Sequence, residues 1–461
     1  GLQEAAREAA SAGSFVAEVV DLVRDHGGDW EVSSAPQDAP VWIYVDPPSS
    51  TSAKHGWKLH VSAALVSAED VLQRAAPVLL DAHVPFKLAA SFRVLEALNE
   101  GEAGVAQIGK FITAYPRDDE EAVDLAVRLD DATRGLRGPR VMSDRPLRRG
   151  SLVHYRFGAF DAPEPGEDDT GADRMAARPV YLAPDGMSDP FIAAGAADED
   201  ETGLIAGRYY VSSTVHRSAR GAVHTAVDMQ DVRDCIIKRA WRDARLDLEG
   251  RDARDGLRAE AEILRRLEGR GPFPRVFDIV EHDTDLLLVL EKLPGVPVAS
   301  VVHRMDERGK HPEPGTVGEW ARAIASALAR VHDAGLVYRD LNPANVLLTR
   351  EGKVSLIDFE LTRAAGEATE FYAAGTPGFL SPQQAEGQPA SPADDVYSLG
   401  AMIVFMSSAV RPSGDVAPIE RTYGTAGAKL VRVAERCLAA DPNHRWSDMR
   451  AVEDALQGTT S

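Results

Sequence analysis

The sequence has few cysteines and no long apolar run, and each absence excludes a class of protein. Its 461 residues include two cysteines, Cys235 and Cys437, too few for a disulfide framework or a cysteine-rich zinc site. No apolar stretch is long enough to span a membrane, and the first residues contain no apolar signal core. We therefore expect a cytoplasmic protein without zinc and without a membrane partner.

Positive charge is also scarce. Lys and Arg total 51 against 72 Asp and Glu, which gives a net charge of −21. Because nucleic-acid binding depends on neutralising phosphates with basic side chains, this balance argues against nucleic acid as the main partner. The length favours two or three domains.

The first 160 residues alternate between strand and helix patterns, which predicts an α+β domain over 1–160. In the strand around Trp57–Val61, Lys58 and His60 should share one face because side chains alternate along a strand. Helices are predicted over 1–26, 68–80, from about 88 to 99, and 118–129, and strands over 41–45, 57–61, 110–115 and 152–157.

A change of composition separates the two halves of the chain. Residues 161–203 are rich in Asp, Glu, Pro, Gly and Ala, which is typical of a linker or of a loop packed on its neighbours. Just before them, Arg134–Arg156 holds seven arginines and one acid, Asp144. That stretch is either a solvated basic face or a site for phosphate or acidic peptide.

The most informative stretch is Val337–Leu348. Asp340 follows an arginine, Asn345 comes five residues later, and Asp358 lies thirteen residues beyond Asn345. A carboxylate such as Asp340 can orient an attacking hydroxyl, and oxygen ligands such as Asn345 and Asp358 can hold Mg²⁺ between phosphates. This spacing resembles the catalytic and metal loops of protein kinases.

The resemblance to Ser/Thr protein kinases covers residues 204–461 and implies a bilobal fold that uses ATP, or another NTP, with Mg²⁺. Several positions depart from the pattern: most loop glycines are missing, Tyr338 stands for His, Asn342 for Lys and Glu360 for Gly. A non-catalytic pseudokinase scaffold is therefore an alternative. The resemblance implies nucleotide binding by Lys238, its partner Glu260, the glycine-rich-loop residue Gly221, and the hinge residues Glu291 and Leu293.

The N-terminal part resembles a second family, the lyase domain of class III and class IV lanthipeptide synthetases, which is similar to bacterial phosphothreonine lyases. The matching segments are Trp57–Ser62, Val84–Lys87, Gly109–Arg117, Ser143–Arg145 and Val153–Gly158. The resemblance implies a phosphothreonine-lyase-like α+β domain ahead of the kinase.

It also implies an activity, the dehydration of Ser and Thr in a precursor peptide that has a leader and a core. The kinase phosphorylates the hydroxyl, and the lyase removes phosphate and the α-proton to leave dehydroalanine or dehydrobutyrine. A neutral lysine can act as base if nearby cations lower its pKa, and arginine can hold phosphate. The roles implied are Lys87 as base, His60 as acid, Lys58 as a further catalytic residue and phosphate-site candidate, and Lys110, Arg145 and Arg156 as phosphate-site candidates.

Full-length members of the family carry a zinc cyclase after the kinase, whereas this sequence stops near Ser461. Either a cyclase is missing from the sequence, or the chain is a two-domain kinase–lyase. The second option resembles the synthetases of avionin-bearing lipolanthines, which work with a separate cysteine decarboxylase. A separate cyclase is another candidate partner. A signalling Ser/Thr kinase with an N-terminal regulatory domain is the alternative function.

Overall fold

The computed structural model describes residues 14–34, 41–48, 55–160, 188–193, 204–247, 249–368 and 375–457. Contacts divide the chain into two compact units, Gly1–Asp255 with Val280–Leu287 and Gly256–Ile279 with Leu288–Ser461. Among the helices of the described residues, none combines the length and apolarity needed to cross a membrane.

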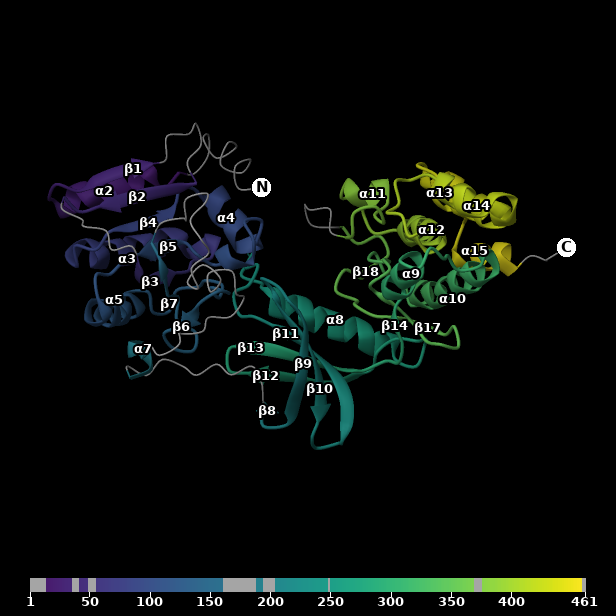
Figure 1. Ribbon diagram of the computed structural model, residues 1–461, viewed down its shortest axis with the longest axis horizontal. Coiled ribbons are helices and arrows are strands. Elements are labelled where there is room, and N and C mark those ends of the chain that lie inside the picture. The colour runs from purple at the N-terminus through teal and green to yellow at the C-terminus, as the bar shows by residue number, and fades with distance from the viewer. Residues whose placement is uncertain are drawn as a thin grey trace. The chain divides into compact units, whose positions relative to one another are not determined.

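An antiparallel sheet organises the N-terminal part of the first unit (Figure 1). Its order, β1-β2-β4-β5-β3-β7-β6, places strands side by side that are not neighbours in sequence. β5 is shorter than predicted because Lys110 N donates to Gln107 O at 3.3 Å in a turn, so the strand starts later. The strands are β1 (Glu31–Ser34), β2 (Trp42–Asp46), β3 (His55–Val61), β4 (Phe86–Ala89), β5 (Ile112–Ala114), β6 (Arg145–Pro146) and β7 (Val153–Ala159).

The predicted helices of this part are present, but the third starts only at Phe92, because Phe86–Ala89 form a strand that was not predicted. The N-terminal helix is confirmed from Val16 on, and residues 1–13 lie outside the described residues. Gly27, with φ +81, ends it, and Asp118 begins α5 by accepting a hydrogen bond from the Glu121 N–H at 2.9 Å. The helices are α2 (Val16–His26), α3 (Ala68–Asp81), α4 (Phe92–Glu100) and α5 (Asp119–Ala132), with 3₁₀ turns at Leu65–Ser67 and Val105–Gln107.

Alternation along β3 separates the two faces of the sheet. Trp57, Leu59 and Val61 are buried in the core. The Trp57 Nε1–H donates to Asp119 Oδ1 of α5 at 2.9 Å, so this face is the one that the helix covers. Lys58 and His60 therefore lie on the other face, as predicted.

Part of the predicted linker packs on this sheet. Phe191, in α7 (Pro190–Ala193), is fully buried and stacks on Tyr155 with ring centroids 3.9 Å apart. The Tyr155 hydroxyl donates to Asp189 Oδ2 at 3.1 Å. Residues 161–187 and 194–203 lie outside the described residues.

A second sheet, in the order β12-β13-β11-β10-β9-β8, begins the predicted kinase region. Where a glycine-rich loop is predicted, a two-residue turn joins β9 to β10, and Trp241 N donates to Arg220 O of that turn at 2.9 Å. Residues 280–287 also belong to the first unit; they are the last residues of β12, the turn after it and the first residues of β13. The strands are β8 (Leu204–Ile205), β9 (Tyr209–Arg217), β10 (Gly221–Asp228), β11 (Arg233–Ala240), β12 (Val276–His282) and β13 (Asp285–Glu291).

Strands β8–β11 belong to the first unit because side chains join them to its N-terminal part. Trp241 packs with Ile108 and Met142 in one apolar cluster, and Arg137 pairs with Asp243 at 2.7 Å. These contacts explain why the division falls at Asp255. The domain boundaries predicted from the sequence, 160/161 and 203/204, stay a prediction.

The second unit is mostly helical. α12 (Pro392–Ser408) is buried along its length and starts with a capping box of Ser391 and Asp394. Helices and sheets occur in both units, which confirms the predicted α+β class. The other elements are α8 (Ala253–Leu267), which the division crosses, β14 (Val296–Pro297), α9 (Val298–Asp306), α10 (Pro314–Asp333), β15 (Leu336–Val337), β16 (Val346–Leu348), β17 (Val354–Leu356), β18 (Arg363–Ala364), α11 (Pro382–Ala385), α13 (Ala417–Tyr423), α14 (Ala428–Cys437) and α15 (Met449–Gln457), with 3₁₀ turns at Gly424–Gly427 and Pro442–His444.

Candidate active sites

In the second unit, the loop between β15 and β16 gathers polar side chains around Asp340. Asn345 Nδ2 donates to Asp340 Oδ2 at 2.8 Å, and Asn342 Nδ2 and Thr376 Oγ1 each donate to Oδ1 at 3.1 Å. Burial raises the pKa of Asp340 to about 6; these hydrogen bonds oppose the shift, and the charge of Asp358 adds to it. Two carboxylates and an amide thus lie together, and such oxygen donors suit Mg²⁺.

Asp395 of α12 holds the backbone of this loop. Its carboxylate accepts hydrogen bonds from Tyr338 N at 2.8 Å and Arg339 N at 2.7 Å, and His332 Nε2 lies 2.8 Å from Oδ2. Arg339 has φ +69, a conformation that costs energy for a residue other than glycine. The bonds to Asp395 therefore stabilise a strained loop directly before Asp340.

The segment that carries Asp358 is tied to α8 and to the same loop. Phe359 N donates to Glu260 Oε1 at 3.0 Å, and both residues are buried. The Tyr338 hydroxyl donates to Ile357 O. Tyr338, one of the departures from the kinase pattern, therefore fixes the residue before Asp358.

The predicted nucleotide-binding residues lie in both units: Glu260 in α8, and the others in strands or just after one. Lys238 is in β11, and Gly221 begins β10. A Cβ at Gly221 would lie 1.8 Å from Arg239 O, so the close approach of β10 to β11 already requires glycine here. Glu291 ends β13, and half-buried Leu293 follows it. Their roles in binding nucleotide stay predictions.

In the first unit, strand pairing brings together basic residues that are far apart in sequence. Thr113 of β5 pairs with Lys87 of β4 on one side and with His60 of β3 on the other. Lys58 pairs with Arg156 of β7. Directly paired residues of antiparallel strands share a face, so these five side chains project from the face of the sheet opposite the Trp57 core.

One carboxylate lies among these cations. Asp144 Oδ2 hydrogen-bonds to His60 Nδ1, and Asp144 Oδ1 accepts a bond from Ser143 Oγ at 2.7 Å and lies 3.8 Å from Arg156 Nη1. All four residues are buried. Burial alone would raise the pKa of Asp144, but His60, Lys110 and Arg156 together hold it well below its usual range. Asp144 is therefore ionised.

Burial moves the neighbouring cations toward their neutral forms. It lowers the pKa of Lys58 to about 8, with further contributions from the charges of Lys110, Lys87 and Arg156. It lowers the pKa of Lys87 to about 8 as well, helped by Lys110. The pKa of Lys110 falls for the same reason. Burial also lowers the pKa of His60, although Asp144 opposes the shift, so the ring is neutral at pH 7.

The structure does not bring Arg145 to this group. β6 pairs Arg145 with Tyr155, whose ring is buried on the core face. Arg145 Nη1 lies 3.5 Å from Asp189 Oδ2 on that side. The other predicted lyase residues, Lys58, His60, Lys87, Lys110 and Arg156, do converge.

Sequence reasoning missed three residues of these sites. Asp144 was noticed only as the one acid of a basic stretch, although it lies in the segment Ser143–Arg145 that carries the family resemblance. Thr376 contacts Asp340 across the loop, and Trp42 lies with its ring centroid 4.5 Å from Lys87 Nζ. No local signal marks the last two, because both contacts depend on the fold.

Comparison with known families identifies both parts of the chain. Residues 210–457 match the family model described as protein kinase domain, and residues 23–202 match the model described as RamC, N-terminal domain. The chain is a member of the protein kinase family with a RamC-like N-terminal domain. This combination confirms the resemblance to class III lanthipeptide synthetases that the sequence predicted.

Curated relatives match either both domains or the kinase domain. A probable SapB synthase of Streptomyces coelicolor is 30% identical over 393 residues, 79% of this chain and 41% of that protein. The serine/threonine-protein kinase PknL of Mycobacterium tuberculosis is 31% identical over 235 residues, 49% of this chain and 56% of that protein. The serine/threonine-protein kinase PksC of S. coelicolor is 28% identical over 277 residues, 54% and 49%. The chain spans less than two thirds of each of these relatives.

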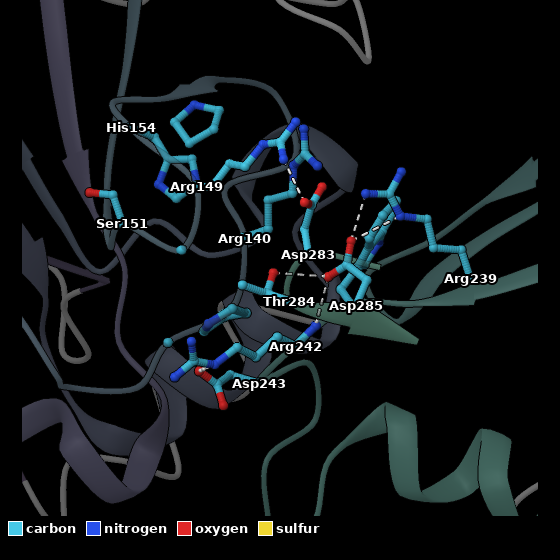
Figure 2. Close-up of a pocket in the computed structure, with 15 residues that line it drawn as sticks. Arg140, Arg149, Ser151, His154, Arg239, Arg242, Asp243, Asp283, Thr284 and Asp285 are labelled. Atoms are coloured by element: carbon cyan, nitrogen blue, oxygen red, sulfur yellow. Dashed lines mark hydrogen bonds and ion pairs between the residues drawn. The ribbon is translucent and has the colours of Figure 1, made fainter. Parts of the chain in front are cut away.

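A small cavity of about 70 Å³ lies in the first unit between the RamC-like domain and the strands around β11. Figure 2 shows that its walls are ion pairs: Arg149 faces Asp283, and Arg239 contacts Asp285 at 2.7 Å. Since Arg149 and Arg239 are already paired with acidic side chains, they are less available to bind an anionic substrate. We therefore do not assign a substrate site to this cavity.

Proposed function

We propose that this chain dehydrates Ser and Thr residues of a ribosomally made precursor peptide by phosphorylation with ATP followed by elimination of the phosphate. One observation carries the proposal: a buried group of cations around Lys58 and Lys87 occurs in the same chain as a kinase domain in which Asn345 donates a hydrogen bond to Asp340. The match to a SapB synthase over 79% of this chain supports a synthetase in place of a signalling kinase.

In the phosphorylation step, Asp340 accepts a hydrogen bond from the substrate hydroxyl and orients it for attack. Asn345 and Asp358 would hold Mg²⁺, which neutralises charge between the phosphates when it is bound. Lys238 holds the α- and β-phosphates in this proposal, and Glu291 and Leu293 contact the base. Asn342 stands where kinases usually have a lysine, so this site has one cation fewer for the γ-phosphate.

In the elimination step, Lys58, Lys110 and Arg156 hold the phosphate of the modified side chain. Lys87 takes the α-proton with its neutral amine, the C–H electron pair becomes the Cα=Cβ bond, and the Cβ–O bond breaks to release phosphate. The division of roles follows charge: Lys58 lies near three cations, one of them Arg156, whereas Lys87 lies near Lys58 and Lys110. A phosphate dianion is best held by the crowded group.

His60 acts as the acid that protonates the departing phosphate. In the free protein its ring is neutral because burial lowers its pKa. A bound phosphate dianion adds negative charge beside the ring, which favours the imidazolium form and raises that pKa. Asp144 fixes the ring by its bond to Nδ1, so Nε2 is the nitrogen left to face the phosphate.

The product class in this proposal is a lanthipeptide or a lipolanthine. Ring closure needs a cysteine thiol and a catalyst for its addition, and we assign no zinc site to this chain. Cys235 and Cys437 are both buried, and both lie in the part of the chain that matches the kinase family model. Ring closure would then depend on a partner such as a separate cyclase or a cysteine decarboxylase, on a further domain of a longer chain, or on unassisted addition of the thiol.

Mass spectrometry of a candidate precursor, incubated with the protein, ATP and Mg²⁺, tests the proposal. Loss of one water per modified residue supports dehydration. Gain of phosphate without water loss would support the alternative of a signalling kinase with a regulatory N-terminal domain. No modification of any candidate precursor, with nucleotide still bound, would support a pseudokinase scaffold.

A further inference from the structure

The amine of Lys87 lies against aromatic rings. Its Nζ is 4.5 Å from the centroid of Trp42 and 5.9 Å from that of Tyr44. Trp42 and Tyr44 occupy alternate positions of β2 and so share a face, and Tyr44 pairs directly with Lys87 of β4. Neither aromatic residue is fully buried. The wall of the site next to Lys87 therefore includes aromatic rings as well as the charges of Lys58 and Lys110.

Lys58 provides an internal comparison, because burial lowers its pKa to the same value, about 8. Its Nζ lies 6.0 Å from the Tyr115 centroid, at the limit of cation–π range and farther than Lys87 from Trp42, and faces Lys110, Lys87 and Arg156. A proton added to Lys58 meets three positive neighbours. A proton added to Lys87 meets the charges of Lys58 and Lys110 and, in addition, an indole face that attracts cations.

We infer that Trp42 is a positioning residue of the elimination reaction: its indole face holds Lys87 Nζ in place and stabilises the positive charge that the amine acquires when it takes the α-proton. The inference deepens the proposed function and rests on it. As the reaction proceeds, the N–H bond forms on Nζ, the Cα–H bond breaks, and its electron pair expels the phosphate. The contact strengthens as Nζ becomes charged, so it lowers the barrier instead of merely binding substrate.

The test is the elimination of phosphate from a synthetic phosphothreonine peptide, measured for the wild type, Trp42→Leu and Trp42→Phe between pH 7 and pH 9. Trp42→Leu should lower kcat by about 2- to 30-fold, the range expected for loss of a cation–π contact. Its pH profile should shift to lower pH, because the ammonium form loses a stabilising partner. Trp42→Phe keeps an aromatic face and should fall between the wild type and Trp42→Leu.

Trp30→Leu is the matched control. Trp30 is another half-buried tryptophan of the same domain, and its ring lies beside His83, with ring centroids 5.9 Å apart, and not over a lysine amine. This variant should keep the wild-type kcat and pH profile.

Three results would overturn the inference while the wild type still eliminates phosphate: an unchanged kcat in Trp42→Leu, a change confined to KM, or a lower kcat without a shift of the pH profile. A Trp42→Phe variant as slow as Trp42→Leu would also overturn the inference. If the leucine variant does not fold, the phenylalanine variant decides the question. A wild type that releases no phosphate would instead contradict the proposed function.

Discussion

The two candidate sites collect opposite charges. Around Asp340 in the second unit there are amides, a hydroxyl and a second carboxylate, whereas Lys58, Lys110 and Arg156 in the first unit lie around the carboxylate of Asp144. The first arrangement can hold a cation and a hydroxyl, as transfer of phosphate to a peptide requires. The second can hold a phosphate as it leaves.

Burial has the same chemical result in both sites despite the opposite charges. It raises the pKa of Asp340 to about 6 and lowers the pKa of Lys87 to about 8, and neighbours of like charge assist each shift. Both groups are thereby brought near neutral pH, where a proton is most easily exchanged. Changing one site and measuring both phosphorylation and elimination tests whether the two sites act independently.

The largest difference between the effects on phosphorylation and on elimination is expected for Asp340→Asn. Loss of the carboxylate that orients the hydroxyl should slow phosphorylation by about 10²- to 10⁴-fold, the usual range for such a group. Elimination from a synthetic phosphopeptide should keep its wild-type rate, because that site lies in the other unit. Rates of both steps, followed by mass spectrometry, check this. Equal loss of both activities would mean that the sites are not independent.

Arg156→Gln should act in the reverse direction. Removing a buried guanidinium from the phosphate site should lower kcat/KM for phosphopeptide elimination by about 10- to 100-fold, since a hydrogen bond to a charged group contributes roughly 1.5–3 kcal/mol. Steady-state kinetics with the phosphopeptide measure the change, and phosphorylation should be unaffected.

Arg145→Gln is the matched control for that variant, because Arg145 lies on the opposite face beside Asp189. Its elimination kinetics should remain those of the wild type. Equal effects of the two substitutions would refute the assignment of one face as the phosphate site.

The pH dependence should also differ between the two steps. The base must be neutral, and the pKa of Lys87 is lowered from 10.5 to about 8, so its neutral fraction grows as pH rises. Below about pH 8, elimination should speed up roughly tenfold per unit and then level off. Phosphorylation should not share this rise. A flat elimination profile from pH 7 to pH 9 would exclude Lys87 as the base.

Local pattern was enough to predict much of this molecule. The spacing of Asp340, Asn345 and Asp358 identified the loop whose side chains the structure brings together, and strand alternation placed Lys58 and His60 on one face. Both inferences need only short-range geometry, which a sequence contains.

Long-range pairing could not be predicted in the same way. Lys87 and His60 lie on either side of Thr113 because β5 is placed between β4 and β3 in the sheet. No local sequence pattern reveals that strand order. Arg145 was grouped with the phosphate site because its two-residue strand was not recognised, and pairing with Tyr155 turns it to the other face. The hydrogen bond between His60 and Asp144 likewise depends on tertiary structure.

The most direct test of two successive reactions in one chain is a comparison of Lys87→Ala with the wild type on the same precursor, with ATP and Mg²⁺. The wild type should convert Ser or Thr to the dehydrated residue, with loss of one water per site. Lys87→Ala should phosphorylate at the wild-type rate and accumulate the phosphopeptide, because the kinase residues are untouched. Identical phosphorylated products from both proteins, with no water lost in either, would contradict the account.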